Sequence, residues 1–469
     1  MNFISLSFLV FAVVVLPLQA LLQRMPALRT AFLLIASYIF YGWWDVRFLL
    51  LIFGSTAIDY GCGIAIRGGR RALSDRLWLL LSLTSNLGCL AAFKYFSFFA
   101  EGLKALLAPL GIAIDSPALN HILPVGISFY TFQSMSYTID RYRGDIALER
   151  DFVRFAAYVA LFPQLVAGPI VRARELLPQL AKNVRAREHD ILRGVEIILF
   201  GLALKLIVAN RLAPLVDERF DFADSFMGGD LLLAGLFFGF QIYGDFAGYS
   251  LIAIGLARIM GFRLPQNFNR PYFAASPSDF WRRWHMTLSR WLRDYLYVPL
   301  GGNRKGSGRT LINLMLVMLL GGLWHGAAIP FLLWGGYHGV LLIAGRLLQR
   351  RQKTRPNSGA VRRWFGTVIT FVAVFVGWLI FRAETAEDLL GIAQIIRSSP
   401  LHITIDPAMI TALGVCALTL AFDGVSGSFR ARKFWVSRPT VRFAGLSALT
   451  FLIVRFGQFD GGDFIYFQF

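Results

Sequence analysis

The chain has 469 residues, of which 56% are hydrophobic and only 16% are charged, and it contains 43 Phe and 11 Trp at a mean hydropathy of +0.57. A soluble globular protein is excluded, because its interior has no room for that much apolar surface. The net charge of +19 would suit nucleic-acid binding, but the basic residues stand in short loops between apolar blocks, which is typical of membrane orientation. The composition therefore predicts an all-α polytopic integral membrane protein with no nucleic-acid partner.

Twelve apolar blocks follow one another along the chain, most of them close to the roughly 20 residues that a helix needs to cross a bilayer. The expected crossings are 3–22, 30–44, 48–66, 77–93, 122–139, 193–210, 231–257, 311–329, 331–345, 364–381, 406–422 and 443–454. The first block should remain as an anchor with its N-terminus outside, because no basic residue precedes it and Arg24 and Arg29 follow it. With alternating crossings, the segments expected in the cytoplasm hold 38 of the 47 Lys and Arg residues, and both termini are expected on the other side.

One further apolar stretch, 152–170, does not fit as a crossing, because it would reverse the charge pattern of every later loop. Pro163 and the Gly168-Pro169 pair would also break a helix there, so we interpret Phe162–Arg172 as a re-entrant or half-buried segment. The stretch Pro271–Pro299 mixes Trp and Arg and is expected to lie at an interface or dip into the bilayer. These features predict one membrane-embedded domain over 1–469, with cytoplasmic or re-entrant segments at 140–193 and 258–310.

Ionisable residues inside a membrane are costly and are candidates for function. His325 stands in the sequence GGLWHGA after an apolar run, which predicts a position deep in the bilayer. A buried neutral imidazole can act as a general base for a hydroxyl group, or it can simply hydrogen-bond a neighbouring helix. The residues alone leave both interpretations open.

Two other ionisable residues are weaker candidates. His285 follows the aromatic and basic run WRRW, where an interfacial role is favoured from the sequence alone. Asp245 lies among small and aromatic residues and would orient a histidine or a substrate, although a helix-to-helix hydrogen bond is favoured. The three Cys residues lack metal or redox spacing, and neither a nucleotide-binding loop nor a serine or zinc hydrolase motif occurs, so no metal and no bound cofactor are expected.

The chain resembles the membrane-bound O-acyltransferase family, in particular the bacterial branch that acetylates alginate or transfers D-alanine to teichoic acids. The segments that carry the resemblance are PVGISFYTFQ at 124–133, FPQLVAGP at 162–169, DFWRRWHMTLSRWLRDYLYVPLGGNR at 279–304, GGLWHGA at 321–327 and FIYFQF at 464–469. These segments are spread over about three-quarters of the chain, in the order that the family shows. The resemblance implies a fold with a central tunnel that joins a cytoplasmic donor entrance to an extracytoplasmic funnel.

The resemblance also implies roles for individual residues. His325 matches the catalytic histidine and His285 the second, supporting histidine, and Tyr466 in the final motif would relay the acyl group or serve only as an aromatic anchor. Arg282, Arg283 and Arg304 would attract an anionic donor such as acetyl-CoA or an acyl-carrier thioester, although membrane lipids would also attract such residues.

Together these expectations describe an O-acyltransferase of the cell inner membrane that moves an acetyl group outward for O-acetylation of an exopolysaccharide. A periplasmic esterase-like partner would complete the transfer. Two alternatives stay open on the sequence: D-alanylation of teichoic acid or acylation of a small lipid within the same family, and a transporter or flippase without covalent chemistry.

Overall fold

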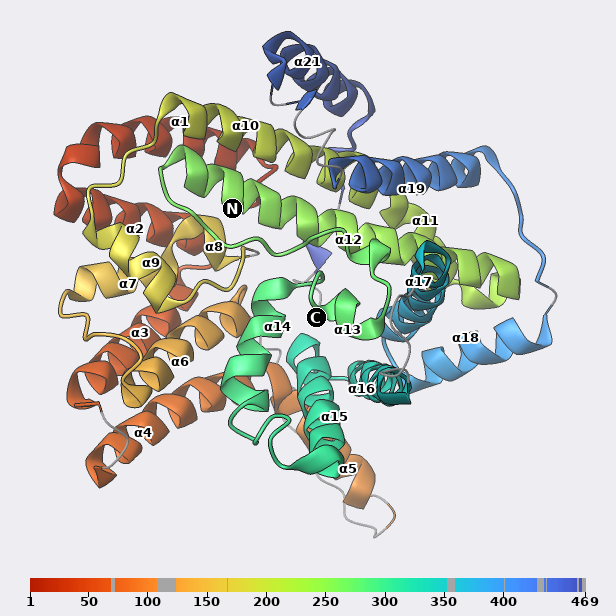
Figure 1. The fold of residues 1–469 in the computed structure, drawn as a ribbon, viewed down its shortest axis with the longest axis horizontal. Helices are drawn as coiled ribbons and strands as arrows, with labels where there is room; N and C mark the ends of the chain where they lie inside the picture. Colours follow the sequence, from red (N-terminus) through yellow and green to blue (C-terminus); the bar gives the residue numbers. More distant parts are fainter. Residues whose placement is uncertain are drawn as a thin grey trace. The chain divides into compact units, whose positions relative to one another are not determined.

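The computed structural model describes residues 1–68, 72–107, 109, 124–166, 168–351, 359–399, 401–427, 434–435, 437–461 and 464–465. Within these ranges every regular element is helical, which confirms the predicted all-α class (Figure 1). The chain divides into two compact units, one formed by Met1–Val195 with Ala253–Pro265 and the other by Glu196–Ile252 with Gln266–Phe469.

Nine helices of the described part are long and apolar enough to cross a membrane. They are Leu6–Arg24, Arg47–Ala65, Leu73–Tyr95, Gly228–Ile259, Gly306–His325, Ile329–Leu348, Ala360–Arg382, Pro407–Ser426 and Pro439–Phe456. A shorter apolar helix covers Pro26–Gly42. The polytopic membrane fold is confirmed, but the predicted number of twelve crossings is not, since 122–139 and 193–210 are not among these helices.

The first unit is built from the N-terminal helices. They are α1 (Leu6–Leu21), η1 (Leu22–Arg24), α2 (Pro26–Gly42), α3 (Arg47–Ala65), α4 (Leu73–Leu90), η2 (Ala91–Tyr95), α5 (Phe96–Leu107), α6 (Ile127–Arg143), α7 (Phe152–Ala160), α8 (Phe162–Leu165) and α9 (Ala173–Ala181). Helices α3, α4 and α6 pack against one another, and α7 packs against α2 and α3.

The predicted re-entrant segment is fully enclosed by protein at its start. Phe162 and Leu165 are buried, and the Gln164 side-chain amide donates to the carbonyl of Tyr158 at 2.7 Å. Gly126 approaches so closely that a Cβ there would lie 2.5 Å from the carbonyl oxygen of Leu165. The protein therefore supplies the contacts that irregular backbone needs at membrane depth.

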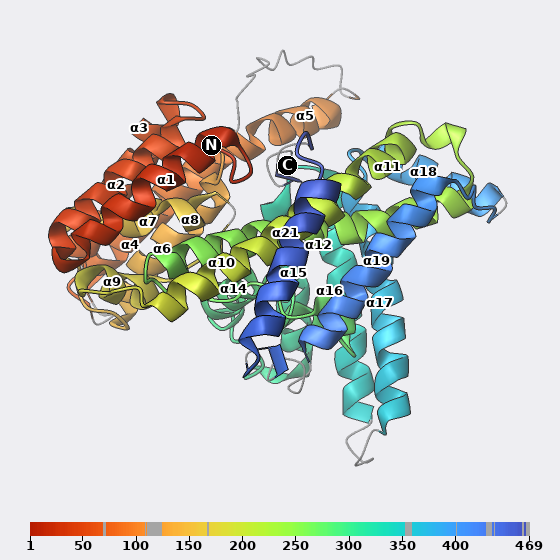
Figure 2. The same cartoon turned by 90° about the horizontal axis from the view of Figure 1, so that it is seen from above.

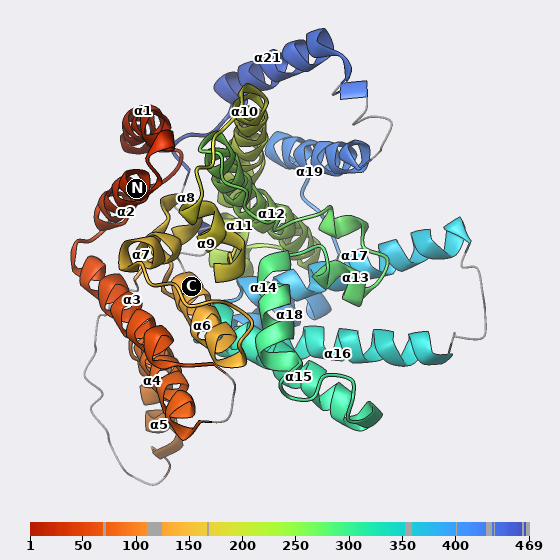
Figure 3. The same cartoon turned by 60° about the vertical axis from the view of Figure 1, so that its left-hand side comes forward.

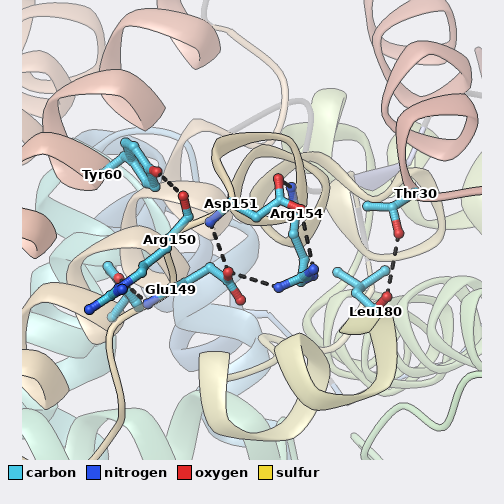
Figure 4. A network of polar contacts seen from close by, with 8 residues as sticks. Thr30, Tyr60, Glu149, Arg150, Asp151, Arg154 and Leu180 are labelled. Carbon is cyan, nitrogen blue, oxygen red and sulfur yellow. Dashed lines mark hydrogen bonds and ion pairs between the residues drawn. The ribbon is translucent and has the colours of Figure 1, made fainter. Parts of the chain in front are cut away.

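The start of α7 is fixed by a polar network at the surface of this unit (Figure 4). Asp151 caps the helix by accepting from the Arg154 amide at 3.1 Å, and the Arg154 guanidinium donates to Glu149 at 2.9 Å. The Tyr60 hydroxyl of α3 donates to the carbonyl of Arg150 at 2.6 Å. These bonds fix where the chain turns back toward the buried segment.

The second unit contains the C-terminal helices. They are η4 (Leu204–Ala209), α11 (Asn210–Asp221), η5 (Ala223–Ser225), η6 (Pro271–Phe273), α13 (Pro277–Trp281), α14 (Met286–Leu292), η7 (Arg293–Tyr297), α15 (Gly306–His325), α16 (Ile329–Arg351), α17 (Ala360–Arg382), α18 (Ala386–Ser398), α19 (Pro407–Ser426) and α21 (Pro439–Phe456). Helices α10 (Glu188–Ala203) and α12 (Gly228–Ile259) contribute residues to both units.

Helices α15 and α16 approach closely because glycine stands at their contact (Figure 3). A Cβ at Gly335 would lie 2.4 Å from the Met318 carbonyl oxygen, and a Cβ at Gly322 would lie 2.2 Å from that of Phe331. Helix α17 packs beside α16 (Figure 2). Helices α16 and α17 thus pack around the end of α15, where His325 lies.

Candidate active site

His325 is the last residue of α15 and is only 3% exposed. Its ring contacts those of Trp324, Trp334 and Phe381, with centroids 5.0, 5.1 and 5.4 Å apart. These aromatic residues come from α15, α16 and α17, so the imidazole lies within an aromatic wall. The carboxyl end of a helix also favours a positive charge, which the ring would carry after accepting a proton.

His285 lies immediately before α14 and is fully buried. Its backbone has φ 40° and ψ 55°, a left-handed conformation shared by only one other non-glycine residue of the described ranges, Arg270. Such a conformation costs energy in a residue with a side chain, and it turns the imidazole inward between α13 and α14. Its ring lies 4.6 Å from that of Phe246 and 5.9 Å from that of Trp324.

The side chain of Asn267 determines which ring nitrogen of His285 carries hydrogen. The Thr287 amide and hydroxyl donate to Asn267 Oδ1 at 3.3 and 3.0 Å, and an amide N–H can only donate. His285 Nδ1 lies 3.0 Å from the same oxygen and must therefore be the donor. Burial lowers the pKa of His285 to about 3, so the ring is neutral near pH 7 and Nε2 carries a lone pair.

The two histidines belong to the same unit, and the Trp324 ring contacts both. Neutral His285 presents a hydrogen-bond acceptor at Nε2, and His325 stands where a positive charge is favoured. Such a pair can remove a proton from a hydroxyl group at His325 and accept a hydrogen bond from a donor group of the substrate at His285 Nε2. In the described residues, no cluster of three or more His, Cys, Asp or Glu side chains could hold a metal ion.

Asp245 lies in the middle of α12 and is 2% exposed. One carboxylate oxygen pairs with Lys205 Nζ at 2.7 Å, and the other accepts from the backbone N–H of Ile465 at 2.7 Å. The sequence predicted an orienting role or a helix-to-helix hydrogen bond, and the structure brings the carboxylate to a lysine and to the C-terminal tail. Tyr466, the next residue after Ile465, lies outside the described residues.

The predicted donor-binding arginines differ in their surroundings. The Arg282 side chain is 69% exposed and lies 3.7 Å from Asp279, and Arg304 is also exposed. Arg283 is largely buried and pairs with Asp279 at 3.0 Å. Arg282 and Arg304 are therefore accessible to an anionic donor, whereas the charge of Arg283 is already matched within the protein.

Two residues of this region were missed by sequence reasoning. Lys205 was visible as a charge within the apolar block 193–210, and intramembrane charges usually have a partner. Asn267 carries no comparable signal, because an asparagine in a polar loop is common, and only the folded chain brings it to His285. A third buried histidine, His338 of α16, packs against the rings of Trp281 and Trp334, with centroids 5.2 and 4.8 Å away.

Comparison with known proteins connects this geometry with a family. The profile of the membrane-bound O-acyltransferase family matches residues 121–384, which include both histidines. A probable alginate O-acetylase of Azotobacter vinelandii is 42% identical over 417 residues, 88% of this chain and 81% of the relative. A peptidoglycan O-acetyltransferase of Helicobacter pylori is 35% identical over 395 residues, 79% of this chain and 74% of the relative.

A teichoic acid D-alanyltransferase of Bacillus subtilis is more distant. It is 28% identical over 342 residues, 66% of this chain and 83% of the relative. The two O-acetyl-transferring relatives are therefore more similar in sequence to this chain than the D-alanyl-transferring relative is.

Proposed function

Because the chain belongs to the membrane-bound O-acyltransferase family, we propose that it carries an acetyl group from a thioester on the cytoplasmic side of the inner membrane to the other side, for O-acetylation of an exopolysaccharide such as alginate. Family membership makes the protein an O-acyltransferase with a multi-pass membrane fold. The preference for acetyl and for a secreted polymer rests on the higher identity to the alginate relative than to the D-alanyl-transferring one.

The observation that carries the mechanism is the buried pair of histidines beside Trp324. His325 would accept the proton of the attacking hydroxyl, whose oxygen then bonds to the thioester carbonyl carbon. The carbon–sulfur bond breaks, and the thiol leaves with the proton that His325 held. His285 would orient the donor or acceptor through Nε2, while Asn267 holds its Nδ1–H.

The first acceptor in this proposal is the phenol of Tyr466. Its neighbours Phe464 and Ile465 are buried in the unit that contains both histidines, which supports a tail that reaches the site. The tyrosine ester would then pass its acetyl group to a hydroxyl of a periplasmic esterase-like partner, regenerating the phenol. The alternative role of this tail is that of an aromatic anchor, which fixes the C-terminus and carries no acyl group.

The relay is tested by Tyr466→Phe, which retains the aromatic ring and removes the hydroxyl. The variant should lose polymer acetylation, and mass spectrometry of the C-terminal peptide from the native chain should reveal an added acetyl group on Tyr466. Full acetylation in the variant, with no acetyl-tyrosine in the native chain, leaves only the anchor.

Donor binding is proposed at the exposed arginines Arg282 and Arg304, with acetyl-CoA or an acyl-carrier thioester as the anionic donor. The positive-inside pattern supports a cytoplasmic position for them and an extracytoplasmic position for both termini. The whole chain, 1–469, is proposed to act as one enzyme, with 140–193 and 258–310 on the donor side.

One experiment distinguishes the proposed enzyme from a transporter. The purified protein in vesicles is given acetyl-CoA labelled in the acetyl group, with an oligosaccharide acceptor and the periplasmic partner on the opposite side. We expect labelled ester on the acceptor and free CoA on the donor side. Intact labelled acetyl-CoA crossing the membrane, without ester formation, would identify a transporter.

A further inference from the structure

The residues that directly follow α21 are held to the protein by hydrogen bonds. The amide of Gln458 donates to the carbonyl of Leu206 at 3.0 Å, and the Asn210 side chain donates to the carbonyl of Gln458 at 2.7 Å. Arg211 donates to the carbonyl of Phe456 at 2.7 Å. The tail is thus attached to η4 and to the first residues of α11, all within the second unit.

Phe464 and Ile465, the last described residues of the tail, lie in the core. Phe464 is fully buried and Ile465 is 5% exposed. The Ile465 N–H donates to one oxygen of the Asp245 carboxylate at 2.7 Å, while the other oxygen pairs with Lys205 Nζ at 2.7 Å. Each carboxylate oxygen therefore has its own partner, and one of the two partners is the tail backbone.

The docked tail lies one aromatic ring away from His285. The Phe464 ring lies 4.7 Å from the Tyr249 ring and 5.8 Å from the Phe246 ring. The Phe246 ring is in turn 4.6 Å from His285. Lys205 lies 5.4 Å from the centre of the Tyr249 ring, so the ion pair and the aromatic contacts surround the same short segment of tail.

A buried ion pair is a poor device for stability alone, because removing two charges from water costs about as much as their attraction returns. Two apolar side chains at positions 205 and 245 would hold η4 against α12 equally well. What an apolar pair cannot provide is an acceptor for the Ile465 N–H, which would be left without a partner in the core. The Asp245 carboxylate therefore does more than join α12 to η4, because it also accepts the hydrogen bond from the Ile465 N–H.

We propose that the Lys205–Asp245 pair is a dock for the C-terminal tail, and that it positions the tail beside His285 for acyl transfer. Asp245 and Lys205 are positioning residues, since they act through the tail. The positioning part rests on the proposed function, in which Tyr466 receives the acyl group, whereas the docking part rests only on the contacts of Phe464 and Ile465.

Two double variants distinguish the effect of the hydrogen bond to Ile465 from the effect of the Lys205–Asp245 ion pair. Lys205→Met with Asp245→Asn removes both charges but retains an amide oxygen that can accept from Ile465. Lys205→Met with Asp245→Leu also removes both charges and retains no acceptor. Neither variant buries an unpaired charge, so the acceptor at position 245 is the main difference between them.

Hydrogen exchange of the C-terminal peptide that contains Ile465 measures docking directly. We expect exchange of this peptide in the Leu variant to be about fivefold faster or more than in the Asn variant, which should resemble the native chain. Acetyl transfer should fall in the Leu variant by a similar factor or more and should be largely retained in the Asn variant. Glu196→Gln provides a control, because Glu196 accepts from Arg442 and Trp435 in the same unit and has no contact with Ile465 among those described.

Equal exchange in the two double variants would overturn the dock. Faster exchange in the Leu variant with unchanged transfer would overturn the positioning role. If the native chain transfers no acyl group, or if Tyr466→Phe transfers normally, the proposed function fails, yet the exchange comparison still decides whether Asp245 holds the tail.

Discussion

His325 is the residue whose loss should affect catalysis most, because the proposed proton transfer depends on it. His325→Ala should lower acyl transfer by about a hundredfold or more, the usual contribution of a general base. The measurement is the rate of labelled acetyl transfer by purified protein. His338→Asn is a matched control, since it removes a buried imidazole of the neighbouring helix α16, and it should retain most of the activity.

A second prediction for a single residue concerns the protonation state of His285. Burial lowers its pKa to about 3, so the ring should remain neutral from pH 8 down to about pH 4, and its protonation should not limit activity there. Asn267→Asp places a carboxylate against Nδ1 and should raise that pKa. Because the raised pKa is reached as the pH falls, the variant should lose activity at a higher pH than the native enzyme.

The pH dependence of the acyl-transfer rate measures this shift. Ser250→Ala is the control, because it removes the partner of the Asn267 amide without adding charge. An identical acid limb for Asn267→Asp and the native chain would mean that neutral His285 is not required.

The sequence indicated His325, because an ionisable residue in apolar surroundings is conspicuous, whereas His285 follows an aromatic and basic run and gained a functional role only from the family resemblance. The sequence did not indicate which residues hold the two imidazole rings in place. Asn267 precedes His285 by 18 residues, and the left-handed backbone at His285 is not predictable from the local sequence, since most histidines have negative φ. Such partners come from tertiary contacts, which no local pattern encodes.

At the scale of elements, apolar patterning predicted most of the membrane helices, while the predicted number of twelve crossings is not confirmed. The block 122–139 became α6, a helix of 17 residues that is almost wholly buried in protein, so its apolar residues face other helices and not lipid. Hydrophobicity reports burial, and it does not distinguish burial in protein from burial in lipid. Pro163 and Gly168-Pro169 indicated that the helix is interrupted there, and α7 indeed ends at Ala160 while α8 covers only Phe162–Leu165. The re-entrant position of this segment stays a prediction.

The contact between α15 and α16 gives a prediction for an element. Gly335→Ala would place a Cβ 2.4 Å from the Met318 carbonyl oxygen, so α16 must move away from α15. The cost should be about 1–3 kcal/mol, seen as a lower melting temperature, with reduced activity because Trp334 packs against His325. The adjacent Gly336→Ala is the control, because its Cβ would meet Leu319 at an ordinary 3.6 Å. Equal melting temperatures would refute the close contact.

At the scale of the whole molecule, the predicted topology places 38 of the 47 Lys and Arg residues on one side of the membrane. A positive surface raises the local concentration of an anionic donor such as acetyl-CoA. Arg282 and Arg304 are exposed and stand in the segment 258–310, which is predicted to face the cytoplasm. Their charges are therefore available to the donor.

Reversing both charges, as Arg282→Glu with Arg304→Glu, should raise the KM for the donor about tenfold at low ionic strength. The increase should shrink as salt is added, since the screening length falls to about 10 Å at 0.1 M. Arg397→Glu is the matched control, because Arg397 is an exposed arginine of α18 in a loop predicted to face the other side, and its reversal should leave KM unchanged. A KM increase that persists at high salt would indicate damage to the fold, and an equal increase for Arg397→Glu would contradict the predicted orientation.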